Sequence, residues 1–183
     1  HIGAARLGNT ARFADQDLYM KVNSFLPDDV QTAYRLVLVE PNELMFPVLR
    51  ENVQKLPIDY ARQVQIVQGM VSDSCKEPFQ TMFRFSLQAE KDYGIPWGVY
   101  GTWVSFNRRM PLDALSTIAT SYHWYIEDPE AWRRFYQAPN VTDYVEGFKV
   151  PCYSPATLIE KHGILASDLG MVVIDAEQLD SRI

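Results

Sequence analysis

Glycines and acidic residues that could bind a nucleotide-like ligand stand beside apolar segments of this 183-residue sequence. Gly3 and Gly8 lie in a short polar stretch before a predicted helix, where backbone N–H groups can approach a ligand closely. Glu40 follows the apolar run 36–39 and can accept hydrogen bonds from the two hydroxyls of a ribose. Because ligands bind at the carboxyl ends of strands in doubly wound sheets, these residues predict a site at one sheet edge.

Two further pairs of polar residues close predicted strands. Ser72 and Asp73 follow a strand that begins near residue 63, and they can hold an adenine through its exocyclic amine. Asp175 and Glu177 follow the apolar segment 169–174, and a carboxylate in that position is typical of the edge of a site. Each pair taken alone also fits an ordinary turn or a solvated strand end. Their order along the chain favours a common ligand site.

The histidines have competing interpretations. His123 lies between Tyr122 and Trp124, and it is either a packed residue of an aromatic cluster or a catalytic base. His162 precedes Gly163 at a predicted helix C-terminus, where a positive imidazole interacts favourably with the helix dipole. Neither histidine has cysteine or histidine partners at metal-ligand spacing, so we predict no metal site. Spacing alone also assembles no nucleophile–histidine–acid triad.

The apolar pattern predicts the elements that must position these residues. Continuous apolar runs suit strands buried on both faces, whereas alternation and aromatic or β-branched residues suit paired strands. We expect strands at 36–39, 63–71, 79–87, 99–106 and 169–174, the third and fourth of them antiparallel. Helices are expected at 46–55, 113–118, from 129, and at 155–163. The expected fold is one α/β domain over 1–183, a three-layer, doubly wound, mostly parallel sheet with an aromatic helical insertion at about 111–148.

Composition excludes several classes of function. The chain has 17 Lys+Arg, 23 Asp+Glu and a net charge of −6, which argues against nucleic acid as a partner. No segment approaches the ~20 apolar residues that cross a bilayer, so the chain is not expected to span a membrane. No targeting signal is visible at the start of the sequence.

The two cysteines bear on the compartment. Cys75 and Cys152 are too few for a disulfide scaffold, which favours a reducing compartment, either the cytoplasm or an organellar lumen. A single disulfide between them stays open. Asn140-Val141-Thr142 matches an N-glycosylation sequon, and without a secretory signal we interpret the match as coincidence.

Several segments resemble the FkbM family of S-adenosylmethionine-dependent methyltransferases. The stretch from Glu40 to Asn52 is similar to that family's E-P-N-x-x-x-F-x-x-L-x-x-N segment. Val71-Ser72-Asp73 resembles its A-x-S-D turn, and residues 103–106 lie where the family has a short strand containing a serine. Residues 150–177 resemble its V-P, L-x-x-L and K-I-D-x-E-G-x-E segments in the same order. The lobe 111–148 is the main unmatched part.

The resemblance implies a Rossmann-like methyltransferase fold and methyl transfer from S-adenosylmethionine to an oxygen, or less often a nitrogen, of a small molecule or glycan. It implies that Gly3 and Gly8 line the cofactor's methionine and ribose and that Glu40 holds the ribose hydroxyls. It implies further that Ser72 and Asp73 lie near the adenine, and that Asp175 and Glu177 lie where methyl donor and acceptor meet. The lobe 111–148 would then cap the acceptor site.

The departures from the family pattern define the alternatives. His1 stands where the family has an acid, and Gln178 stands where it has a glycine. The loop between Gly3 and Gly8 is one residue longer, and the expected strand before it is missing, which indicates a piece of a longer protein or a decayed cofactor site. The main alternative is therefore an inactive, methyltransferase-like interaction subunit whose aromatic lobe 111–148 binds a protein partner. A third is a nucleotide-binding α/β domain with another cofactor.

Overall fold

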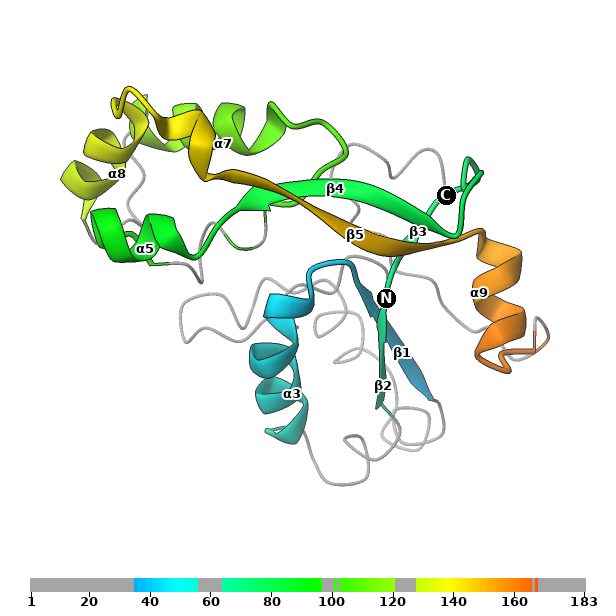
Figure 1. Cartoon of the computed structure of the whole chain (residues 1–183). Coiled ribbons are helices and arrows are strands. Elements are labelled where there is room, and N and C mark those ends of the chain that lie inside the picture. The colour runs from blue at the N-terminus through cyan, green and yellow to red at the C-terminus, as the bar shows by residue number, and fades with distance from the viewer. Residues whose placement is uncertain are drawn as a thin grey trace. The chain divides into compact units, whose positions relative to one another are not determined.

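The computed structural model describes residues 35–55, 64–96, 101, 103–120, 128–165 and 167. The chain divides into two compact units. The first contains the described residues up to Gln80 and from Val150 onward, and the second is Thr81–Lys149. Helices and strands occur together in the chain (Figure 1), so the predicted mixed α/β class is confirmed.

The first sheet is a parallel pair of strands. β1 spans Leu36–Glu40 and β2 spans Val64–Gln68, and their register runs from Leu36 opposite Val64 to Glu40 opposite Gln68. β1 is the predicted apolar strand, and its Leu38 and Val39 are almost completely buried, as suits a strand covered on both faces. The two strands end together, which places Glu40 at their carboxyl edge.

A helical segment follows β1 and confirms the helix expected at 46–55. The 3-10 helix η2 spans Glu43–Met45, and the side chain of Asn42 caps it by accepting a hydrogen bond from the backbone N–H of Leu44. Helix α3 spans Phe46–Gln54, with a proline in its first turn, where the missing N–H costs nothing. Its buried side chains include Leu49.

The single strand predicted at 63–71 is in fact two strands in different sheets. β2 ends at Gln68, and β3 spans Met70–Val71 in the second sheet. Gly69 lies at the break, where its N–H donates to the carbonyl of Glu40 at 3.2 Å. A Cβ on Gly69 would lie 2.4 Å from Cε2 of Tyr153, so a side chain there would collide with that ring. The alternating pattern runs through the break and therefore does not reveal it.

The second sheet has the strand order β3-β5-β4. β4 spans Phe79–Phe85 and β5 spans Val145–Tyr153; β3 pairs with β5 in parallel. The N–H of Cys152 donates to the carbonyl of Pro78 and the N–H of Ser86 donates to that of Tyr144, so β4 and β5 run antiparallel. Segment 99–106, the predicted partner of β4, contributes only the isolated bridge between Phe83 and Ser105 among its described residues.

Three helices of the second unit surround an aromatic core. Helix α5 spans Gln88–Tyr93 and was not predicted, whereas α7 (Met110–Thr120) and α8 (Pro129–Tyr136) confirm the helices expected from 113 and from 129. The side chain of Asp128 caps α8 by accepting from the N–H of Ala131 at 2.9 Å. Trp132 and Phe135 of α8 are buried and contact rings from other segments, so these two rings of the predicted lobe form the core of the unit.

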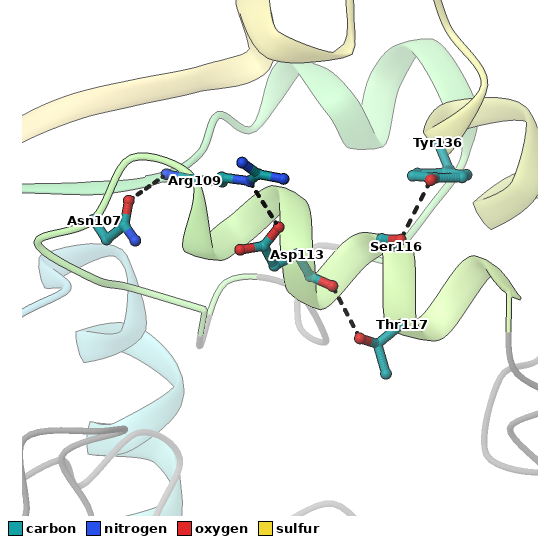
Figure 2. A network of polar contacts seen from close by, with 6 residues as sticks. All are labelled: Asn107, Arg109, Asp113, Ser116, Thr117 and Tyr136. Atoms are coloured by element: carbon teal, nitrogen blue, oxygen red, sulfur yellow. Dashed lines mark hydrogen bonds and ion pairs between the residues drawn. The ribbon is translucent and has the colours of Figure 1, made fainter.

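A polar network along α7 ties this helix to its surroundings (Figure 2). The side chain of Asn107 accepts from the N–H of Arg109 at 3.0 Å, and the Arg109 guanidinium pairs with Asp113 at 3.3 Å. Ser116 donates to the hydroxyl of Tyr136 at 3.3 Å and so links α7 to α8. Both partners of the Arg109–Asp113 pair are exposed, and such pairs contribute little to stability. We therefore interpret the network as helix capping and packing.

The last helix packs in the first unit and follows its predicted signals. Helix α9 spans Pro155–Lys161, and the side chain of Ser154 caps it by accepting from the N–H of Thr157 at 3.1 Å. Gly163 has a φ of 61°, the left-handed conformation expected after a helix end. Leu158 of α9 belongs to a buried cluster with residues of β1, β2, β3 and β5: Val39, Val67, Val71 and Tyr153.

A disulfide joins Cys75 to Cys152, with a Cα–Cα distance of 5.6 Å. It is the single disulfide that the sequence left open, and it uses both cysteines of the chain. The disulfide therefore does not support the reducing compartment that the small number of cysteines favoured. Within the described ranges, no helix is both long and apolar enough to cross a membrane.

Candidate functional site

The candidate site begins with Glu40 at the carboxyl end of β1. Its side chain is buried, with 4% exposure, although carboxylates are rarely buried without partners. Oε1 accepts a hydrogen bond from the backbone N–H of Asn42 at 2.8 Å. Glu40 also makes an interaction besides this bond. Its carboxylate is thus a buried, held acceptor at the carboxyl end of β1, the edge where ligands bind in parallel sheets.

Three of the residues that carry the resemblance after Glu40 are buried, whereas Phe46 is half-buried. Asn42, Leu49 and Asn52 are 0%, 0% and 4% exposed. Asn42 caps η2, and the side-chain oxygen of Asn52 accepts from Lys55 Nζ at 3.3 Å. These side chains therefore shape the turn and helix that follow β1. Of this segment, the backbone N–H of Asn42 holds the Glu40 carboxylate, a role that the sequence did not assign to it.

Ser72 and Asp73 differ in their environments. Ser72 is buried, and its hydroxyl lies 2.8 Å from that of Ser74 while also accepting from the Ser74 N–H at 3.2 Å. Asp73 is exposed in the turn between them. Ser72 follows β3 by one residue, and β3 begins two residues after Gln68, which pairs with Glu40. The turn at Ser72 therefore follows, within a few residues, the end of β2 that pairs with Glu40.

The loop 72–78 is fastened to β5 at both ends and in its middle. The N–H of Ser72 donates to the carbonyl of Tyr153 at 2.9 Å, and the N–H of Cys152 donates to the carbonyl of Pro78 at 2.9 Å. Between these two bonds, Cys75 forms the disulfide with Cys152. The adenine-side turn predicted from Ser72 and Asp73 is therefore held by β5, a strand distant in sequence.

The remaining predicted site residues lie outside the described part of the chain. They are the loop glycines Gly3 and Gly8, the proposed base His123, and the acidic pair Asp175 and Glu177. The structure places Glu40 at the end of β1 and Ser72 directly after β3, which belong to different sheets instead of the one sheet edge predicted, and the contribution of the other five stays a prediction. Within the described residues, no cluster of three or more histidines, cysteines or acidic residues could hold a metal ion.

No protein-family model, curated protein or solved structure matches this chain. Any proposal about function is therefore based on the geometry around Glu40.

A second polar cluster joins the starts of β1 and β2 to the end of α9. Arg35 donates to the side-chain oxygen of Gln65 and to the backbone carbonyl of His162, the latter at 3.0 Å. The amide nitrogen of Gln65 lies 3.0 Å from Nδ1 of His162. Because Arg35 occupies the amide oxygen, the amide nitrogen must donate to Nδ1, which places the ring proton on Nε2. Nε2 is buried and has no hydrogen-bond partner among the described residues.

This environment contradicts the dipole interpretation of His162. Burial lowers the pKa of His162, and the positive charges of Lys161 and Arg35 lower it further. A favourable contact between a positive imidazole and the helix dipole would raise the pKa instead. His162 is therefore a neutral structural acceptor. Sequence reasoning missed its partners because Arg35 and Gln65 are 127 and 97 residues away in the chain.

Acidification should destabilise the protein through His162. Its pKa in the folded protein lies below the ordinary 6.5, so the unfolded chain binds more protons between these two values, and stability falls as pH falls through that window. We expect a larger loss of stability between about pH 7.5 and 5.5 for the wild type than for His162→Gln, measured by urea unfolding. Equal losses in the two proteins would contradict the prediction.

Tyr144 and Asp92 form another pair with shifted pKa values. The Tyr144 hydroxyl donates to Asp92 Oδ2 at 2.7 Å, a bond that raises the pKa of Tyr144 to about 12 and lowers the pKa of Asp92. Gln88 also donates to this carboxylate, at 2.7 Å. Shifted pKa values often mark functional sites. Here both shifts keep the groups in their ordinary states at neutral pH, and the pair fastens α5 to η3 (Val141–Tyr144).

Proposed function

We propose that this chain is a methyltransferase domain of the FkbM type, which transfers a methyl group from S-adenosylmethionine to an oxygen of a small molecule or glycan. The observation that carries the proposal is the buried carboxylate of Glu40 at the carboxyl end of the parallel strand β1. The proposal includes the Rossmann-like strand order that the resemblance implies. The resemblance at Glu40–Asn52 supports it, and within that segment the N–H of Asn42 holds the carboxylate.

The residues at this edge fit the ribose of S-adenosylmethionine. A ribose offers two hydroxyl donors, and the Glu40 carboxylate is an acceptor-only group held by the N–H of Asn42. The turn at Ser72, held by the Cys75–Cys152 disulfide, is the proposed adenine side. When bound, the cofactor supplies a methyl group on a positively charged sulfur. The chain's own task is then to align that methyl group with the acceptor oxygen.

The test is binding of S-adenosylhomocysteine to the intact, oxidised protein by calorimetry. Ligand at ~100 times its dissociation constant should add about 2.7 kcal/mol to the stability of the wild type. Glu40→Gln keeps an oxygen that can accept from the N–H of Asn42 but removes the charge. We expect Glu40→Gln to weaken binding about tenfold or more, because hydrogen bonds to charged groups contribute about 1.5–3 kcal/mol.

Glu51→Gln is a matched control, because it makes the same substitution as Glu40→Gln at another glutamate of the first unit. Glu51 of α3 is exposed and pairs with Lys55 at 2.8 Å, so Glu51→Gln should leave binding unchanged. If Glu40→Gln bound the ligand as tightly as the wild type, the ribose would not lie at Glu40. If the folded wild type bound no ligand, the inactive interaction subunit would become the better proposal.

We also propose an oxidising compartment in place of the reducing one that the cysteine count favoured. Disulfides form and persist in secreted proteins and in the lumen of the secretory pathway, and are rare in the cytosol. Both cysteines of this chain are paired. Alkylation of the intact protein in unbroken cells should therefore leave both cysteines unmodified, whereas reaction of both would contradict this placement.

A further inference from the structure

The sequence contains one N-glycosylation sequon, Asn140-Val141-Thr142, although it has six asparagines. Such a triplet arises often by chance and has meaning only where the asparagine is accessible and the protein enters an oxidising secretory lumen. The structure provides an observation for each condition. The sequon lies in the turn between α8 and β5 (Figure 1).

The Asn140 side chain is exposed and is not used by the fold. Asn140 stands at the N-cap of η3, yet its side chain makes no capping hydrogen bond. Asn42 and Asp128, at the N-caps of η2 and α8, both accept a backbone N–H. The backbone of Asn140 is nevertheless held, because its carbonyl accepts from the N–H of Asp143 at 2.9 Å. The amide group is thus presented to solvent on a fixed turn.

The surroundings of Asn140 leave room for a bulky group. Pro139, Thr142 and Asp143 are exposed as well, so the residues around Asn140 are accessible to solvent. Thr142, whose hydroxyl a sequon requires, contributes only its backbone carbonyl to η3, where it accepts from the N–H of Val145. A glycan attached here displaces no buried side chain.

The disulfide is independent evidence for the second condition, an oxidising compartment. Cys75 and Cys152 lie in the first unit, whereas the sequon lies in the second, and the bond between them indicates an oxidising compartment. The same lumen holds the enzymes that glycosylate sequons in eukaryotic cells. The sequence alone offered no observation for this compartment, which is why the sequon was interpreted as coincidence.

We propose that Asn140 carries an N-linked glycan. In the transfer, Nδ2 of Asn140 forms a bond to C1 of the first sugar of a polyisoprenyl-pyrophosphate-linked oligosaccharide. The bond from C1 to the pyrophosphate oxygen breaks, the lipid pyrophosphate leaves, and one amide proton passes to a base of the transferring enzyme. The inference is independent of methyl transfer, since it uses no residue of the Glu40 edge.

The test uses the intact protein produced in animal cells. Treatment with a peptide N-glycosidase should raise its electrophoretic mobility by one step, and mass spectrometry should place the modification on the peptide that contains Asn140. Asn140→Gln and Thr142→Ala should both abolish the step, whereas Thr142→Ser should preserve it because serine also completes the sequon. Asn107→Gln, at another exposed asparagine, should leave the step unchanged.

Two results would overturn the proposal. One is an oxidised, folded wild-type protein whose mobility and peptide mass the glycosidase does not change. The other is a wild-type protein whose two cysteines are reduced in the cell, because the compartment argument would then fail. Neither result would alter binding of S-adenosylhomocysteine, so this proposal and the proposed function fail separately.

Discussion

Replacing both Cys75 and Cys152 by alanine should lower the free energy of unfolding by about 4 kcal/mol. The disulfide joins residues 77 positions apart, and a cross-link over a loop of that length removes much of the conformational entropy of the unfolded chain. The loop that it closes contains the whole second unit, Thr81–Lys149. The disulfide therefore links the segment that precedes the second unit to the segment that follows it.

The measurement is chemical unfolding of the wild type and the double variant, each with and without a reducing agent. Reduction should destabilise the wild type by about as much as the double substitution does, and should leave the variant unchanged. Because loop 72–78 stays bonded to β5 through Ser72 and Pro78, the reduced protein should still fold. A wild type whose stability is insensitive to reduction would contradict the prediction.

Replacing Phe135 by alanine should cost about 3–5 kcal/mol of stability, the second large effect. The ring is completely buried and lies 5.0–5.3 Å, between centroids, from three others: Phe85, Tyr93 and Tyr144. Its loss would open a cavity that these rings, held by α5, β4 and η3, could fill only in part. Aromatic pairs in such geometries also contribute beyond the area that they bury.

The neighbouring ring provides the control. Tyr136 stands next on the same helix and is 37% exposed, so Tyr136→Ala removes an aromatic ring with the same change in helix propensity but should cost less than about 1 kcal/mol. Thermal or urea unfolding of the two variants gives the comparison. Equal costs would show that Phe135 is not the centre of the core of the second unit.

The packing of Phe135 also limits the use of the aromatic residues by a partner. Trp132 and Phe135 are 1% and 0% exposed, so they have no surface to offer to a protein or an acceptor. Tyr122, Trp124 and Tyr125 of the same predicted lobe lie outside the described residues. A role of the lobe 111–148 in binding therefore stays a prediction for those three and for exposed side chains such as Tyr136.

Local signals in the sequence determined most of the elements. The apolar run before Glu40 predicts β1, and Asp128 and Ser154 with their following prolines predict the starts of α8 and α9. Gly163 marks the end of α9 because its left-handed φ suits glycine. These features succeed because a helix cap or an apolar run depends on residues within a few positions of one another.

Only the tertiary structure decided how these elements meet. β4 pairs with β5 and meets segment 99–106 through the antiparallel bridge from Phe83 to Ser105. The strand predicted at 63–71 is two strands that separate at Gly69, where a side chain would collide with the Tyr153 ring. The Cys75–Cys152 bond and the Gln65–His162 contact likewise join positions 77 and 97 residues apart. Strand alternation and residue type do not encode such partners, because pairing depends on packing between segments that are remote in the chain. The sequence alone thus determined where helices and strands form and that an acid follows β1, while packing decided that this acid is buried and which turn lies beyond it.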